Sequence, residues 1–380
     1  MIGLNDLKRA LIKLGEPQHP RAERLTPFGL AARYGLDSAS TPAVIKDIST
    51  SGIYLVTEKR LPAGELITLA LEEEGQPEFS SELQISVQAR VVEQREDGMG
   101  LSFVLPPGLH ADLWGVLIRD IASLTDRDQI TLLFRTLRTI LILCRLCQSE
   151  AEEAILLVGG ELDSDHTETL IKIALAAENL LASEPDAGRM RAHPRLLANI
   201  LREGSWAPDE LTMQLWTGLL VSSCSTDAPD DSNQVFVDLL IHITPVQAKI
   251  IIYACEQALG SSPGAEHSPS DSIVLNSREI IELTGMYDLY RNATDLAYLY
   301  NLGLIKKLFD FTSYHGAETF DITPTILGLE LYKHCHGHRE KPEQNLIEAA
   351  NAHLLNFLTQ TQPTDIDGKT LPSEPPPSGS

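Results

Sequence analysis

The chain has 380 residues, of which 30 are Lys or Arg and 53 are Asp or Glu, so its formal net charge is −23. This length suffices for two or three domains, and a hydrophobic fraction of 43% excludes a disordered polyelectrolyte. So negative a chain repels nucleic acid and anionic lipid, and any anionic ligand must be held by a local group of cations.

The first 16 residues predict a helix or arm and no export signal, because Lys8, Arg9 and Lys13 interrupt the apolar residues. The most apolar stretch, 130–147, contains three arginines, which are costly in a bilayer, so no membrane span is expected. The five cysteines are few and odd in number, which indicates reduced thiols and a cytoplasmic location.

Residues 43–104 predict a small antiparallel β-barrel. Val, Ile and Leu recur in five short segments, often in alternation with polar residues, and turn sequences such as STSG separate them. The five segments are AVIKDIS, GIYLVTE, LITLALEE, ELQISVQARVVEQ and GMGLSFV. Strands at this spacing are typical of a small barrel.

From about residue 109 onward the pattern changes to helices. Apolar residues recur at helical spacing, and strand signals become scarce. Polar stretches at 222–233 and 261–272 predict loops or linkers. The last twenty residues, 361–380, contain five prolines and little to bury, which predicts a disordered tail.

The candidate binding residues lie where a basic segment meets the first strands. The first 46 residues carry seven Lys and Arg against four Asp and Glu. A turn with Asp47, Ser49 and Gly52 follows, in which a carboxylate and a hydroxyl can bond a ligand and glycine permits positive φ or a close backbone approach. Arginines from the preceding segment can fork onto phosphate oxygens and stack on purines.

These segments together resemble the PilZ domain, whose pattern is Arg-x-x-x-Arg followed by Asp/Asn-x-Ser-x-x-Gly. The segments that carry the resemblance are HPRAER, AARYG, DISTSGIYLVTEKRLPAGELITLAL and ARVVEQREDGMGLSFV. The resemblance covers roughly residues 17–120, with a closing helix near 109–124. It implies a β-barrel domain over 17–124 that binds cyclic di-GMP, with Arg21 at the second arginine of the first motif.

One position departs from the pattern. Pro17 stands where the first arginine is expected, so only Arg21 and Arg24 remain. A charge-assisted hydrogen bond is worth roughly 1.5–3 kcal/mol, or about ten-fold to more than a hundred-fold in affinity. Two interpretations therefore stay open. One is a sensor that binds cyclic di-GMP weakly, and the other is a degenerate domain that binds no nucleotide and acts by protein contact. The sensor's ligand residues would be Arg21, Arg24, Asp47, Ser49 and Gly52.

Residues 125–240 predict a helical domain, and residues 244–341 a winged-helix-like unit. In the latter, three helices, a two-stranded wing and a further helix follow each other in the order of a winged helix-turn-helix. Its segments LYNLGLI and FDITPTILGLELY also look similar to the Abi-alpha group of bacterial phage-defence proteins. This unit has eight Lys and Arg and twelve Asp and Glu, so its net charge is negative. A negative charge disfavours DNA binding and a role as a transcription regulator, and it favours contact with an unidentified protein partner.

Two further groups suggest metal binding at first sight. Cys144 and Cys147 lie in an apolar helical run, which favours buried thiols over metal ligands. The histidines of 334–338 lie at the end of a predicted helix, where they interact favourably with the helix dipole. No Ser-His-Asp order, phosphate loop or dinucleotide fingerprint appears in the sequence, so neither an enzyme nor a cofactor or metal is expected.

The sequence thus predicts a multidomain α+β protein, a cytoplasmic bacterial signalling protein without catalytic activity. The resemblance to PilZ implies that the small antiparallel barrel binds cyclic di-GMP, and the mostly helical region is expected to relay the event; the alternative is the adaptor that binds no nucleotide.

Overall fold

The computed structural model describes most of the chain between residues 24 and 360. The described ranges are 24–27, 30–36, 41–73, 84–109, 111, 114–115, 117–119, 127–148, 164–260, 272–306 and 319–360. The predicted arm at 1–16, the predicted tail at 361–380 and Arg21 lie outside them. The chain divides into two compact units, 1–231 and 232–380, and the division falls inside the predicted linker at 222–233. The other predicted domain bounds stay predictions.

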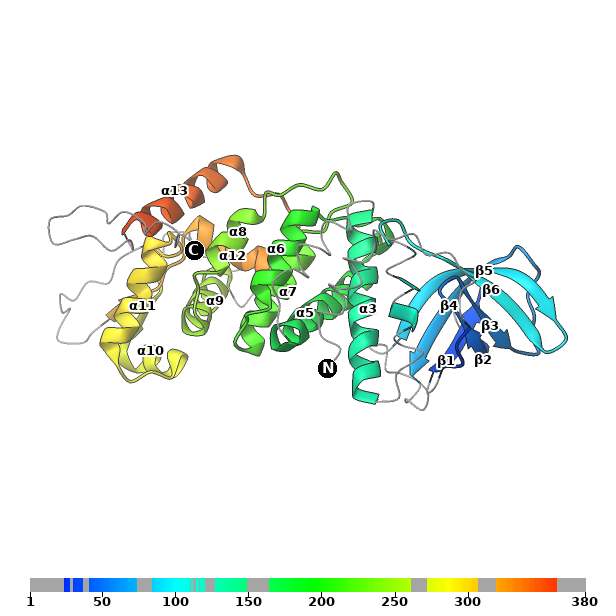
Figure 1. The fold of residues 1–380 in the computed structure, drawn as a ribbon. Coiled ribbons are helices and arrows are strands. Elements are labelled where there is room, and N and C mark those ends of the chain that lie inside the picture. Colours follow the sequence, from blue (N-terminus) through cyan, green and yellow to red (C-terminus); the bar gives the residue numbers. More distant parts are fainter. Residues whose placement is uncertain are drawn as a thin grey trace, which may run out of the picture. The chain divides into compact units, whose positions relative to one another are not determined.

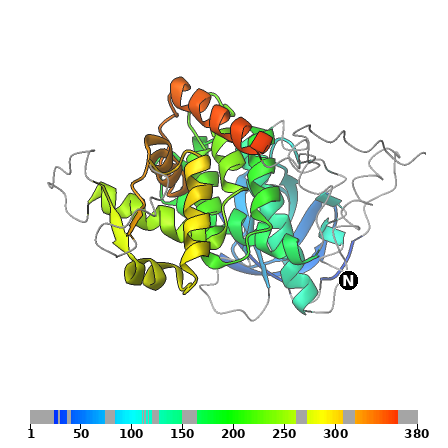
Figure 2. The same ribbon diagram turned by 90° about the vertical axis from the view of Figure 1, so that its left-hand side faces the viewer.

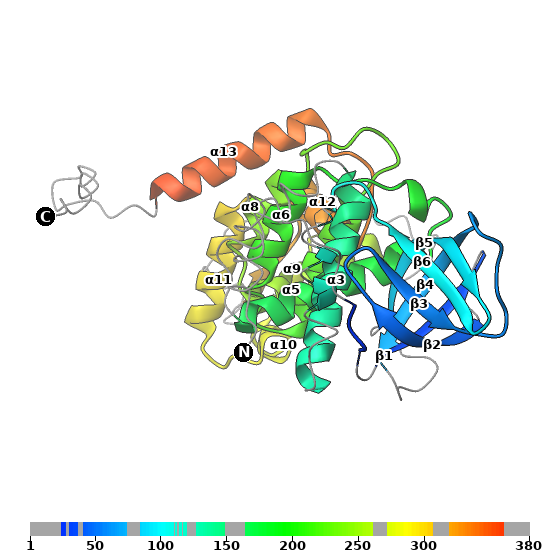
Figure 3. The ribbon, with the colours of Figure 1, turned by 45° about the vertical axis from the view of Figure 1, so that its right-hand side comes forward.

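The first unit contains a closed barrel of six antiparallel strands in the order β1-β2-β3-β6-β5-β4 (Figure 1). The strands are β1 (Leu30–Gly35), β2 (Thr41–Ile48), β3 (Gly52–Val56), β4 (Leu66–Glu73), β5 (Gln84–Arg95) and β6 (Gly98–Val104). Figure 3 shows how they curve around a common interior. Closure pairs both edges of every strand, and it confirms the predicted barrel.

Alternate residues of each strand fill the barrel. In β1, Leu30, Ala32 and Tyr34 are buried and the residues between them are half-buried. The Tyr34 hydroxyl is hydrogen-bonded to Oγ1 of Thr57 at 2.8 Å and donates to the carbonyl oxygen of Lys59. The hydroxyl group of Tyr34, the largest side chain of β1, is therefore buried in the core together with its hydrogen-bond partners.

Two β-bulges interrupt this alternation. The register of β2 and β3 shifts between Ile45 and Asp47, and the register of β5 and β6 shifts just before Glu93. Because of the first bulge, Ile45 and Ile48 are both buried, whereas neither Lys46 nor Asp47 between them is. The bulge thus turns two successive polar residues toward the outer face of the barrel.

The described residues of the first unit that follow the barrel are mostly helical. The helices among them are α3 (Arg127–Cys147), α5 (Ser164–Ala182), α6 (Pro194–Gly204) and α7 (Glu210–Ser222), with a short 3-10 helix at Ala187–Arg189. Their bounds lie close to 130–147, 167–182, 193–204 and 209–221, the segments in which the sequence shows apolar residues at helical spacing. The carboxylate of Asp209 accepts a hydrogen bond from the backbone N–H of Thr212 at 2.8 Å and so caps α7. Arg138 of α3 and Glu178 of α5 form an ion pair at 2.8 Å.

Where it is described, the second unit is helical with one short sheet. Its helices are α8 (Gln234–Leu240), α9 (Pro245–Leu259), α10 (Ser277–Thr284), α11 (Leu289–Asn301), α12 (Ile326–Cys335) and α13 (Gln344–Gln360). Strands β7 (Val274–Asn276) and β8 (Thr319–Asp321) pair antiparallel. Figure 2 shows α11 in yellow against α13 in red, and the two helices are in contact.

Capping residues set the ends of α9 and α10, and they agree with the sequence, in which Thr244 and Pro245 open one helix and Gly285 ends the next. Thr244 and Gln247 form a capping box at the start of α9, and Asn276 and Glu279 form one at the start of α10. Helix α10 ends at Gly285, whose φ of 73° is left-handed, a conformation that glycine adopts without strain.

The elements from α9 to α12 follow the order helix, strand, helix, helix, strand, helix. The predicted wing is represented by a bridge between Ile305 and Pro324 and by a hydrogen bond of 2.8 Å from the Lys306 N–H to the Thr323 carbonyl oxygen. Residues 307–318 lie outside the described ranges. The winged-helix assignment stays a prediction.

Candidate functional site

The segment before β1 lies alongside the end of β2. Leu25 and Ile48 exchange two backbone hydrogen bonds of 2.9 Å each. This bridge places Arg24 at the turn that follows β2, where its Nη1 is 3.4 Å from Oδ1 and 3.5 Å from Oδ2 of Asp47. The Arg24 side chain is 62% exposed and that of Asp47 is 23% exposed. The structure thus brings these two predicted site residues together.

Ser49 and Gly52 shape the turn. The backbone N–H of Ser49 donates to the carbonyl oxygen of Gly52 at 2.8 Å, and the Ser49 hydroxyl donates to the same oxygen at 3.1 Å. Gly52 does not have a positive φ. Its missing side chain matters for another reason, because a Cβ there would run into the carbonyl oxygen of Leu101 in β6. The close approach at Gly52 is therefore an approach between two strands.

The helical residues after the barrel pack against this turn. A Cβ on Gly115 would lie 2.9 Å from Cγ2 of Thr50, so glycine lets the helix backbone come close to the turn. The neighbouring Trp114 is fully buried, and its ring meets that of Phe103 edge to face with centroids 5.0 Å apart. The turn is thus held by β6 on one side and by this helical segment on the other.

Asp47 is one end of a row of residues paired across four strands. The row runs from Asp47 in β2 through Tyr54 in β3 and Gly100 in β6 to Glu93 in β5. Since Gly100 has no side chain, the Tyr54 ring lies beside it, with Cδ2 3.8 Å from where a Cβ would stand. The Tyr54 hydroxyl donates to Oδ1 of Asp97 at 2.6 Å. Burial, and then this hydrogen bond, raise the pKa of Tyr54 to about 12.

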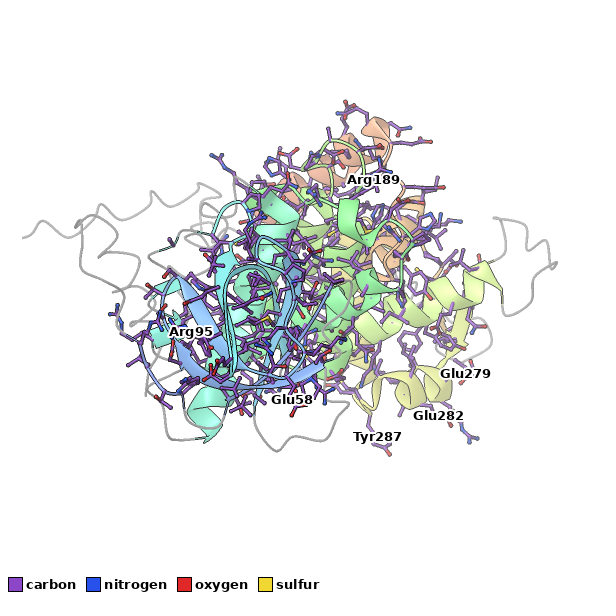
Figure 4. All side chains as sticks on the ribbon, turned by 90° about the vertical axis from the view of Figure 1, so that its right-hand side faces the viewer. Glu58, Arg95, Arg189, Glu279, Glu282 and Tyr287 are labelled. Carbon is purple, nitrogen blue, oxygen red and sulfur yellow. The ribbon has the colours of Figure 1, made fainter. Side chains whose placement is uncertain are left out.

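Two cations flank the Tyr54 ring. The Nζ of Lys46 is 5.2 Å and the Cζ of Arg95 is 5.4 Å from the ring centroid. Each cation is also ion-paired, Lys46 with Asp97 at 2.7 Å and Arg95 with Glu93 at 2.8 Å. Figure 4 shows Arg95 at the surface of the barrel. These residues, together with Asp47 and Arg24, form what we call the outer-face cluster.

The ion pairs set the charges of the outer-face cluster. The hydrogen bond from Lys46 is the main reason why the pKa of Asp97 is as low as about 2. Arg95, through its hydrogen bond, and more weakly the charge of Arg24 lower the pKa of Glu93. Both carboxylates are therefore ionised at neutral pH and match the cations beside them.

Of the other residues that the sequence singled out, Cys144, Cys147 and His334 are core residues, whereas His336 and His338 are exposed. Cys144 and Cys147 are buried free thiols, and burial raises the pKa of Cys144 to about 12. His334 stacks on Phe236 with ring centroids 4.4 Å apart, and burial lowers the pKa of His334 to about 4. Within the described ranges, no cluster of three or more His, Cys, Asp or Glu side chains could hold a metal ion. None of the helices described is long and apolar enough to cross a bilayer.

A closed six-stranded barrel with Asp, Ser and Gly on the turn between β2 and β3 is the arrangement that the sequence motif implied. Residues 18–119 match the PilZ domain. These bounds lie within one residue of the predicted range 17–120. The PilZ domain is a non-enzymatic binding domain, and its members typically bind cyclic di-GMP and proteins.

The helical part of the chain matches a second family model. Residues 166–332 match the model described as abortive infection alpha, which confirms the resemblance that the sequence showed in two short segments. The matched range spans the division between the two compact units. Among curated proteins, none is found to be similar to this chain.

Proposed function

We propose that this protein is a cytoplasmic bacterial signalling protein whose PilZ domain binds cyclic di-GMP and whose helical region relays this event to a protein partner. The ion pair between Arg24 and Asp47 carries the proposal. A nucleotide needs a cation for its phosphate and an acceptor for the N–H groups of guanine, and the bridge between Leu25 and Ile48 puts one of each at the same turn.

Each site residue has a separate task in this proposal. Arg24, together with Arg21, binds phosphate and stacks on the guanine, while Asp47 accepts hydrogen bonds from the guanine edge. Ser49 offers its hydroxyl oxygen, and Gly52 keeps β3 close to β6 so that the turn holds its shape. Arg24 must first leave Asp47, but an exposed ion pair contributes less than about 1 kcal/mol, so the exchange costs little.

The relay follows from the order of the segments. A ligand that binds both the turn and the segment with Arg21 and Arg24 stabilises one arrangement of that segment, and this differential affinity is what can shift contacts of the helical region. The match of residues 166–332 to abortive infection alpha supports an output in phage defence. All five cysteines are free and buried, which fits the reducing cytoplasm. We assign no catalytic activity to the chain.

A second candidate is an adaptor that binds no nucleotide. The outer-face cluster favours it, because Arg24, Lys46 and Arg95 each have a carboxylate partner in the ligand-free structure. An adaptor needs a contact surface, and Tyr287 and Tyr290 at the start of α11 are 86% and 77% exposed. Figure 4 shows Tyr287 at the surface of the second unit.

Calorimetric titration of the full chain with cyclic di-GMP tests the proposal. We expect micromolar or tighter binding that weakens about ten-fold or more in Arg24→Ala and in Asp47→Ala. Arg189→Ala is the matched control, because Arg189 is an exposed arginine 3.6 Å from Asp186 outside the barrel. Absence of heat at high ligand concentration would reject the sensor in favour of the adaptor.

A further inference from the structure

Arg24 and Arg95 stand at the two ends of one row on the barrel. Arg24 pairs with Asp47, the first member of the row, and Arg95 pairs with Glu93, the last. Neighbouring strands are about 4.8 Å apart, so the row of four strands places its ends about 14 Å apart along the curved sheet. Besides the hydrogen bond from Arg95, the charge of Arg24 also lowers the pKa of Glu93, which agrees with the two guanidinium groups lying on the same part of the barrel surface.

The stretch between the two arginines contains one residue without a side chain and one aromatic ring. Gly100 leaves β6 without a side chain in this row, and the ring of Tyr54 lies beside it. Tyr54 is only 3% exposed although it faces outward, because its neighbours cover it. The hydroxyl is fixed on Asp97 at 2.6 Å, and the ring in turn supports the Arg95 guanidinium at 5.4 Å. Tyr54 is thus a positioning residue for Arg95.

Glu93 takes the place at Arg95 that a phosphate would take. Its Oε1 is 2.8 Å from Nε and its Oε2 is 3.0 Å from Nη2, a two-pronged contact. A carboxylate and a phosphate present pairs of oxygens to guanidinium in the same geometry. The two side chains are 51% and 48% exposed, and exposed pairs hold each other weakly, so an anionic ligand can displace Glu93.

Lys46 is the other cation beside the ring, but it is more firmly engaged. Its Nζ is 2.7 Å from Asp97, whose second oxygen is held by the Tyr54 hydroxyl. Lysine also presents a point charge and lacks the planar fork of arginine. Of the two cations, Arg95 is therefore the one suited to grip a phosphate.

We infer that Arg95 is a second phosphate-binding group of this PilZ domain, occupied in the free protein by Glu93, and that it supplies the guanidinium that Pro17 does not. The inference rests on the proposed binding of cyclic di-GMP. On binding, a phosphate of the nucleotide replaces the carboxylate of Glu93, and Arg24 and Arg95 hold the ligand from the two ends of the row.

Titration of full-length variants with cyclic di-GMP tests this role. Arg95→Ala should weaken binding about ten-fold or more, and Arg95→Lys should recover part of the loss, because it restores the charge without the fork. Glu93→Gln should bind more tightly than the natural chain, since it removes the competing charge. The matched control is Arg90→Ala, which removes an exposed arginine of the same strand that donates to the carbonyl oxygen of Gly64 at 3.0 Å.

The outcomes separate this inference from the proposed function. Binding that is equally tight in the natural chain and in Arg95→Ala would overturn the inference and leave the function standing. Binding seen only in Glu93→Gln would support the inference and show that Glu93 blocks the site. If neither the natural chain nor Glu93→Gln binds, both the function and the inference are wrong. Retained hydrogen-exchange protection of the barrel strands in each variant ensures that a loss of binding is not a loss of fold.

Discussion

Replacing Gly52 with alanine should destabilise the barrel without any ligand. Gly52 faces Ser102 across the β3–β6 ladder, and a new Cβ would meet the carbonyl oxygen of Leu101 and lie 3.3 Å from its carbonyl carbon. These are backbone atoms, so the two strands must separate. Overpacking of this kind costs about 1–3 kcal/mol. Loss of the nearby hydrogen bond from the Phe103 N–H to the Ser51 carbonyl oxygen, 3.1 Å long, adds about 1 kcal/mol.

We therefore expect a loss of about 2–4 kcal/mol, measured by hydrogen exchange on peptides that cover β3 and β6 of the full chain. A local method is needed, because a chain of two compact units need not unfold in one step. Gly100→Ala is the control, since its Cβ would have its nearest neighbours at 3.5–3.8 Å, an ordinary contact. Its stability should change by no more than about 0.5 kcal/mol. If Gly52→Ala behaves like Gly100→Ala, the strands do not approach as described, and contact with a ligand becomes the reason for glycine at this position.

Two further substitutions test the cores of the two units. Tyr34→Phe removes the hydroxyl bonded to Thr57 and Lys59 and should cost about 1–2 kcal/mol in exchange protection of β1; unchanged protection would contradict the buried hydrogen bonds. The pKa of His334 is about 4 in the folded chain and about 6.5 when unfolded, so the unfolded chain takes up the proton first and stability falls as the pH drops from 6.5 toward 4. The loss reaches about 3 kcal/mol in the natural chain and should be missing from His334→Phe when hydrogen-exchange protection of α12 is compared across this pH range; equal pH dependence in both would refute the assignment.

The strands that could be predicted from the sequence are those in which apolar and polar residues alternate over enough positions to be recognised. Strand β1 is missing from that prediction, because LAARYG places alanine on both of its faces and its buried set is only Leu30, Ala32 and Tyr34. Strand β7 has three residues, too few for any period, and is stabilised by its pairing with β8. The bounds of α9 and α10 could be predicted because their capping residues are local signals.

The candidate site divides in the same way. Asp47, Ser49 and Gly52 could be found because they are close together in the sequence and form a motif. Glu93 and Arg95 could not, since only the strand pairing and the two bulges bring them to the same face as Asp47. A shift of register by one residue would turn each of them to the other side of the sheet.

The close contact between Gly115 and Thr50 gives the domain a built-in optical probe. Trp114 precedes Gly115, so any ligand that displaces the turn also disturbs the dry surroundings of this indole. Trp206 is 64% exposed, so its emission is expected at the longer wavelengths of a solvated indole, apart from that of Trp114. With Trp216 replaced by phenylalanine, the emission of a buried indole belongs to Trp114 alone, and fluorescence without a label shows whether a ligand displaces the turn or leaves its shape unchanged.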